Sequence, residues 1–203
     1  MEVSRDELEA RYSTRPARLR AVWLAVPLFL WFVAPTTASL SVGGGLVLVG
    51  LVLRGWAAGS IRKGEELTTT GPYAFVRHPL YLGSLVLGLG ITVASGYLWW
   101  PGVFLLFYLA VYWRTMAGEA RLLDAVYGST YRDYAARVPA LVPRLTPYRP
   151  DASSEASSEP GGVDGPEGVG FTWGRYGRNN EWEAAAGSLA VLGYLMLRWW
   201  LGS

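Results

Sequence analysis

The sequence contains no cysteine and a single histidine, His78, and these scarcities exclude several kinds of chemistry. Without cysteine there is no disulfide framework, no thiolate metal site and no cysteine nucleophile. One histidine cannot build a multi-histidine metal site, and a serine–histidine–aspartate triad would have to use His78. We therefore expect no metal site in the chain.

The sequence also lacks a continuous basic face. Its net charge is only +2, and its cationic residues, nearly all arginine, cluster between apolar runs. Nucleic acid is therefore a poor candidate partner. Apolar residues are abundant instead, with 51% hydrophobic residues, 10 Trp and a mean hydropathy of +0.21. This exceeds what the core of one small globular domain needs, so we expect the lipid bilayer to surround the protein.

Five apolar runs approach the length of a transmembrane helix, which needs about 20 mainly apolar residues. The predicted spans are residues 21–34, 39–59, 80–98, 99–113 and 184–201. Only turn-forming residues separate the third span from the fourth, which predicts a tight helical hairpin. The expected fold is all-α, a polytopic membrane protein of about five transmembrane helices.

The distribution of charge predicts the orientation of these spans. Every Lys and Arg except Arg198 lies in residues 1–20, 54–78 or 114–178, whereas the short connections 35–39 and 95–101 carry no charge. The positive-inside rule therefore puts the N-terminus and the long loops in the cytoplasm and the C-terminus outside. Arg198 should snorkel to the outer interface beside aromatic residues.

Composition divides the chain into four parts. Residues 151–170 are dominated by Ser, Glu, Gly and Pro and cannot bury enough apolar area to fold, which predicts a flexible linker. Before it lie a cytoplasmic segment, 1–20, and a four-span body, 21–150. After it, residues 171–203 form an interfacial segment and the last span, for which we expect the role of an additional membrane anchor.

Glycines recur inside two of the predicted spans. They are Gly43, Gly44 and Gly45 in one span and Gly83, Gly88 and Gly90 in the next. Small residues let transmembrane helices approach closely, and we expect that role here. They do not form a dinucleotide-binding fingerprint, because no strand precedes Gly88 and the third glycine is missing.

Residues 62–83 bring five charged residues and the only histidine next to a predicted span. Pro79 disfavours a helical conformation at His78 and suits the first turn of the following helix. Arg77 and His78 should therefore lie at a helix N-terminus, which favours an anionic group. Alternatively, they only contact lipid phosphates as topology anchors. The stiff Gly71–Tyr73 start and the ring of Tyr81 favour a built pocket.

Residues 119–139 form the second polar segment. The apolar spacing predicts a helix that stops at Gly128, and Thr130 with Asp133 resembles a capping box that starts another short helix. A purely structural role, as an interfacial helix pair with tyrosine anchors, is the alternative to a functional site. Glu119 emerges from the fourth span where an ionisable residue needs a partner, for which Arg77 and Arg114 are the candidates.

Together the two segments resemble the isoprenylcysteine carboxyl methyltransferase family and its relatives among the membrane phospholipid methyltransferases. The first family block, G-P-Y-x-x-x-R-H-P-x-Y-x-G, is matched throughout by Gly71–Gly83. The second block is matched by Glu119, Leu123, Tyr127, Gly128, Tyr131, Tyr134, Pro143 and Arg144. It departs twice, with Ala120 replacing the second acidic residue and Tyr127 replacing a phenylalanine. The resemblance covers residues 45–147.

This resemblance implies an integral membrane methyltransferase that uses S-adenosylmethionine in a cytoplasmic pocket. A tunnel between helices would admit a lipophilic acceptor, either an isoprenylcysteine-type carboxylate or a lipid amine. The implied cofactor-binding residues are Arg77, His78, Pro79, Tyr81, Gly83, Glu119, Tyr131 and Tyr134. The implied catalytic residues are His78, Glu119 and Arg144, with Arg144 orienting an acceptor carboxylate and His78 or Glu119 taking the proton of an acceptor amine.

Two other functions remain open from the sequence. Membrane sterol and enone reductases resemble this fold and carry a related R-H-P-x-Y block, but they bind NADPH. In this sequence Arg62 and Lys63 would bind the phosphates of NADPH. A non-catalytic membrane scaffold is the other alternative, and Ala120 in place of an acid favours it.

Overall fold

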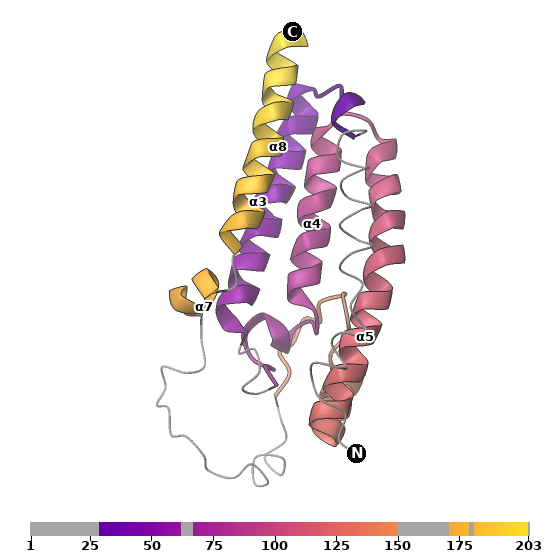
Figure 1. The fold of residues 1–203 in the computed structure, drawn as a ribbon, viewed down its shortest axis with the longest axis vertical. Coiled ribbons are helices and arrows are strands. Elements are labelled where there is room, and N and C mark those ends of the chain that lie inside the picture. The colour runs from indigo at the N-terminus through magenta and orange to yellow at the C-terminus, as the bar shows by residue number, and fades with distance from the viewer. Residues whose placement is uncertain (1–28, 62–66, 150–170, 179–180, 203) are drawn as a thin grey trace.

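The computed structural model describes residues 29–61, 67–149, 171–178 and 181–202 (Figure 1). The named elements are α3 (Thr37–Ser60), the 3-10 helix η1 (Gly71–Ala74), α4 (Pro79–Ala94), α5 (Trp99–Arg137), α7 (Trp173–Arg178) and α8 (Glu181–Gly202). No strand occurs within these described ranges, as the all-α expectation requires. The long helices α3, α4, α5 and α8 run alongside one another as a bundle.

Two of the described helices, Thr37–Ser60 and Trp182–Gly202, are long and apolar enough to cross a membrane. The third predicted span is shorter than expected, because α4 ends at Ala94 where Gly96 adopts a φ of 88°. Its 16 residues extend about 24 Å, less than a hydrocarbon core of about 30 Å. The first predicted span lies mostly outside the described residues. The count of five spans therefore stays a prediction.

Glycines bring the backbones of α3 and α4 into direct contact. A Cβ atom at Gly43 would lie 2.5 Å from the backbone nitrogen of Ala94, and one at Gly90 would lie 2.6 Å from that of Val47. Gly83 likewise faces the backbone of α3, whereas Gly88 faces the ring of Phe104 on α5. The expectation of close helix contacts is confirmed for these four positions.

Gly44 and Gly45 differ from the other glycines of the two spans. A Cβ atom at either position would meet nothing within 4 Å. The expected contact role is therefore wrong for this pair, because both residues lie on faces of α3 that approach no described neighbour.

Helix α5 continues far beyond the expected fourth span. Its 39 residues correspond to about 58 Å of helix, roughly twice the hydrocarbon thickness, so the whole of α5 is too long to fit within a bilayer core. The chain between Arg114 and Ala125 is rich in strong helix formers, which explains the absence of a break after Trp113. The predicted stop at Gly128 is present as a kink with φ 54° and ψ −124°.

The C-terminal unit packs onto the body of the protein. The N–H of Thr172 donates to the carbonyl of Gly59 (3.0 Å), and the ring of Phe171 lies against the same glycine. Farther along, Leu192 and Leu195 of α8 are buried in a core cluster with Val47 of α3. Helix α8 is thus a structural component of the bundle as well as a candidate membrane span. The predicted linker, residues 151–170, lies outside the described residues.

The two ends of the bundle differ in chemistry. At one end the two uncharged connections meet, where the N–H of Ala34 donates to the carbonyl of Ser95 (2.8 Å). The C-terminus of α8 lies at this end, and η1 with the N-terminus of α4 lies at the other (Figure 1). This segregation agrees with the predicted topology, while the assignment of each end to a side of the membrane stays a prediction.

The contact between α3 and α4 predicts opposite effects for two neighbouring glycines. Gly43→Ala should destabilise the protein by about 1–3 kcal/mol, because the added methyl group collides with the backbone of α4. Gly44→Ala should be neutral or stabilising by up to about 1 kcal/mol, because alanine favours a helix and nothing obstructs it. Denaturant titration in mixed micelles, followed by circular dichroism, measures both. Equal effects of the two changes would contradict the packing described here.

Candidate active site

The first polar segment is held rigid by local backbone geometry. Gly71 adopts a φ of 60°, which favours glycine, and opens η1 with Pro72 in its first turn. His78 is the N-cap of α4, with φ −123° and ψ 65°, and Pro79 is its first residue. The predicted role of Pro79 at the start of the helix is therefore confirmed. The backbone of His78, between the preceding segment and the first turn of α4, is therefore held in one conformation.

The chain after α5 returns and binds this segment through its backbone. The N–H groups of Arg77 and His78 donate to the carbonyls of Pro139 (2.9 Å) and Ala140 (3.1 Å). In the opposite direction, the N–H groups of Arg144 and Tyr148 donate to the carbonyls of Phe75 (2.9 Å) and Ala74 (2.8 Å). These four bonds join the two polar segments into one cap at the end of the bundle.

Tyr134 anchors the cap from the kinked end of α5. Its side chain is 3% exposed, and its hydroxyl donates to the carbonyl of Tyr73 at 2.7 Å. Burial raises the pKa of Tyr134 well above its ordinary value, and this outweighs the opposing effect of the Arg77 charge. The hydroxyl therefore remains a hydrogen-bond donor. Tyr131 and Val138 complete this buried cluster.

His78 and Glu119 form the central pair of the candidate site. The Nδ1 atom of His78 lies 3.5 Å from Oε2 of Glu119, close enough for an ion pair if the imidazole is protonated but too long for a strong hydrogen bond. His78 is 6% exposed, whereas the side chain of Glu119 is 42% exposed. The partner of Glu119 is therefore His78 and not the expected Arg77 or Arg114, because the N-cap residue of α4 faces α5.

Arg77 extends to another part of the cap. Its Nη1 donates to the hydroxyl of Tyr131 over a long 3.4 Å. Its Nε atom is buried and has no hydrogen-bond partner among the described residues, and the same holds for Oε2 of Glu119. A buried polar atom without a partner costs about 1–3 kcal/mol, so both atoms are suited to a polar ligand.

A column of aromatic rings leads from His78 into the space between α4 and α5. The ring of Tyr81 lies 5.5 Å from His78 and 5.4 Å from Tyr112, which stacks on Tyr108 at 4.2 Å. The hydroxyl of Tyr108 donates to the carbonyl of Tyr81 at 2.6 Å. Sequence analysis missed Tyr108 and Tyr112. Their spacing of four residues, one turn of a helix, would have put them on one face with Phe104.

Two other residues named from the resemblance have contacts of their own. A Cβ atom at Gly83 would lie 2.7 Å from Cγ of Arg54, so this glycine makes room for α3. The guanidinium of Arg144 donates to the carbonyl of Arg137 (3.1 Å) and to the hydroxyl of Thr146 (3.3 Å). Neither residue forms a hydrogen bond or ion pair with His78 or Glu119 in the described part of the chain.

Comparison with known proteins gives a family match and several relatives. Residues 38–130 match the model of the family described as phospholipid methyltransferase. The nickel-cobalt-cadmium resistance protein NccN of Alcaligenes xylosoxydans xylosoxydans is 34% identical over 120 residues, covering 58% of this chain and 56% of that protein. The chain thus spans about half the length of this curated relative. No solved structure matches the chain.

Two further relatives are named as methyltransferases. Methanethiol S-methyltransferase 2 of Bradyrhizobium diazoefficiens is 42% identical over 85 residues, which cover 41% of this chain and 31% of that enzyme. The protein-S-isoprenylcysteine O-methyltransferase of Schizosaccharomyces pombe is 30% identical over 83 residues, 41% of this chain and 35% of that enzyme.

The helical bundle with membrane-length helices and the family match define a membrane protein. More specifically, residues 38–130 match the phospholipid methyltransferase family, and the chain is similar to relatives named as isoprenylcysteine and methanethiol methyltransferases, which confirms the family resemblance. The matched residues include His78 and Glu119 and end before Tyr131. The roles assigned to Tyr131, Tyr134 and Arg144 remain predictions.

The buried bond from Tyr134 predicts a measurable loosening of the cap in Tyr134→Phe. The carbonyl of Tyr73 would lose its donor at a cost of about 1–2 kcal/mol, so local opening should rise by roughly tenfold. Hydrogen exchange of the Arg77 and His78 amides, read by mass spectrometry, measures this opening. Tyr127→Phe is the matched control, because its ring contacts the same cluster while its hydroxyl bonds no described residue. Unchanged exchange in Tyr134→Phe would contradict the anchoring role.

Proposed function

We propose that the protein is an integral membrane methyltransferase that transfers a methyl group from S-adenosylmethionine to a lipophilic acceptor. The observation that carries this proposal is the buried His78, fixed as N-cap of α4 and 3.5 Å from Glu119 Oε2. Both residues lie within the match to the phospholipid methyltransferase family. The acceptor is an isoprenylcysteine-type carboxylate or a lipid amine.

The polar groups of the candidate site suit the donor. The cofactor carries a carboxylate, an amine, ribose hydroxyls and a sulfonium. Arg77, with its unpaired buried Nε, and His78, the N-cap of α4, would hold the carboxylate. Glu119, through Oε2, would accept a hydrogen bond from a hydroxyl or from the amine. The ring of Tyr81, next to His78, is a candidate to face the sulfonium.

When bound, S-adenosylmethionine supplies an electrophilic methyl group whose transfer proceeds by in-line displacement at carbon. The protein's contribution is then mainly to position the reactants and to exclude water. His78 is buried on the side of the aromatic column, so an apolar acceptor entering between α4 and α5 would meet the imidazole at its inner end. If the acceptor is an amine, the imidazole of His78 takes its proton and Glu119 stabilises the resulting cation.

The acceptor carboxylate and the acceptor amine make different demands on Arg144. Its guanidinium is bonded within the segment 137–146, so binding a carboxylate would require it to exchange those two hydrogen bonds for the acceptor. An amine acceptor makes no such demand. Arg144→Gln should therefore reduce turnover of a carboxylate acceptor and leave turnover of an amine acceptor nearly unchanged.

Donor binding by the purified full chain in detergent tests the proposal. Titration calorimetry should give binding of S-adenosylmethionine that His78→Ala and Glu119→Gln each weaken by about tenfold or more, because each change removes a charge-assisted contact. Asp124→Asn is the matched control for Glu119→Gln. Asp124 is a carboxylate on the same helix that pairs with Arg132 at 3.0 Å, on the exposed surface.

A screen with labelled methyl donor then identifies the acceptor among prenylated cysteine, lipid amines and small apolar thiols, the last because one relative is named for such a reaction. Binding of NADPH without S-adenosylmethionine would overturn the proposal in favour of a reductase. Binding of neither would favour a non-catalytic scaffold. Full donor affinity in both His78→Ala and Glu119→Gln would remove these residues from the site.

A further inference from the structure

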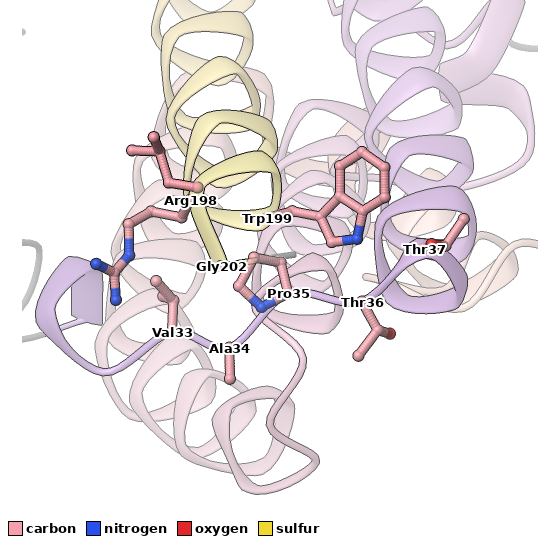
Figure 2. Close-up of a pocket in the computed structure, with 9 residues that line it drawn as sticks. Val33, Ala34, Pro35, Thr36, Thr37, Arg198, Trp199 and Gly202 are labelled. Carbon is pink, nitrogen blue, oxygen red and sulfur yellow. The ribbon is translucent and has the colours of Figure 1, made fainter.

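A cleft of about 610 Å³ lies at the end of the bundle opposite the cap (Figure 2). Residues 33–37, which lead into α3, line one wall, and Arg198, Trp199 and the last residues of α8 line the other. Figure 2 shows Arg198 and Trp199 extending from α8 to opposite sides of the view, with Pro35 between them. The cleft is thus built from two segments far apart in the sequence.

Among the described residues at this end of the bundle, Arg198 is the only charged one. Residues 29–41, 91–103 and 184–202, which make up this end of the bundle, contain no other Lys, Arg, Asp or Glu. Within the described ranges Arg198 makes no ion pair and no hydrogen bond. Arg198 is exposed, and its guanidinium, which offers five donors in a planar fork and is always charged, is therefore open to an anion from outside the described part of the chain.

The surroundings of Arg198 mark the depth of a membrane interface. Four exposed tryptophans gather at this end from separate segments: Trp31, Trp99, Trp199 and Trp200. Exposed tryptophan is enriched at the level of lipid headgroups. Helix α8 has 22 residues and a length of about 33 Å, close to the thickness of the hydrocarbon core. An arginine near its end therefore lies where lipid phosphates are concentrated.

We propose that this cleft binds the phosphate of a phospholipid headgroup, with Arg198 as its charged partner. A planar guanidinium pairs with two phosphate oxygens at once, which a simple topology anchor does not require. The lining also includes Val33, Pro35 and Trp199, and these apolar groups suit the glycerol and upper acyl chain better than a free hydrated ion. This site is separate from methyl transfer, and the lipid is bound there without being chemically changed.

Lipid retention by the full chain tests the proposal directly. Native mass spectrometry during titration with phosphatidylglycerol in detergent gives the affinity of the first lipid bound. Arg198→Gln should weaken it by about tenfold, and Arg198→Lys should weaken it less, because lysine keeps the charge without the fork. Arg149→Gln is the matched control, since it removes the same charge from an exposed position in the cap. Circular dichroism of each variant verifies folding.

Three results would overturn the proposal. The first is an equal loss of affinity in Arg198→Gln and Arg149→Gln, which would mean that only net charge matters. The second is unchanged affinity in a folded Arg198→Gln protein. The third is displacement of the lipid by millimolar inorganic phosphate, which would make the ligand a free anion. Selective loss in Arg198→Gln without competition by phosphate is the expected result.

Discussion

The backbone pairing between residues 74–77 and the returning chain at 139–148 is the constraint on which the candidate site depends. His78 precedes a proline, so the local sequence removes the helical option at this residue, but it does not choose among extended conformations. The bonds from Arg77 and His78 to Pro139 and Ala140 make that choice. Once the backbone is fixed there, the side chains diverge, with Arg77 directed to Tyr131 and His78 to Glu119. The backbone pairing therefore positions the side chains of the candidate site.

The position of the cap also depends on α4 not sliding along α3, and the glycine contacts between these two helices restrict such sliding. Backbone-to-backbone contact at Gly43, Gly50 and Gly90 leaves little freedom for sliding, because a close-packed interface has few side chains that can rearrange. Helix α5 makes a different kind of contact with α4, through large rings, one of which, Phe104, packs against Gly88. The rings of Tyr81, Tyr108 and Tyr112 keep the two helices apart in the half of the bundle next to the site. A lipophilic acceptor would have to enter on this wider side.

Sequence analysis identified the features that depend on local stereochemistry. Pro79 determines where α4 begins and Gly128 determines where α5 bends, because proline and glycine act on their own backbone whatever surrounds them. It could not identify the partner of Glu119, since arginine and histidine are equally acceptable cations and only the relative rotation of α4 and α5 decides between them. It also treated residues 171–203 as an additional anchor, because burial of Leu192 and Leu195 depends on which helix α8 meets. The two sequence blocks of the family resemblance pointed to candidate site residues that composition alone does not distinguish.

The difference in exposure between His78 and Glu119 bears on how one small site can serve two unlike reactants. A polar cofactor and an apolar acceptor partition into different solvents, so a single shared entrance would oblige one of them to cross an unfavourable environment. The side chain of Glu119 is 42% exposed, although its Oε2 atom is buried, while His78, 6% exposed, adjoins the aromatic column between two helices of the bundle. The Nδ1 atom of His78 and the Oε2 atom of Glu119 are 3.5 Å apart, so groups bound to these two residues would be close neighbours. In the proposed reaction each reactant would reach this point from the phase in which it is soluble, and the histidine–glutamate pair would lie at the boundary between the two routes.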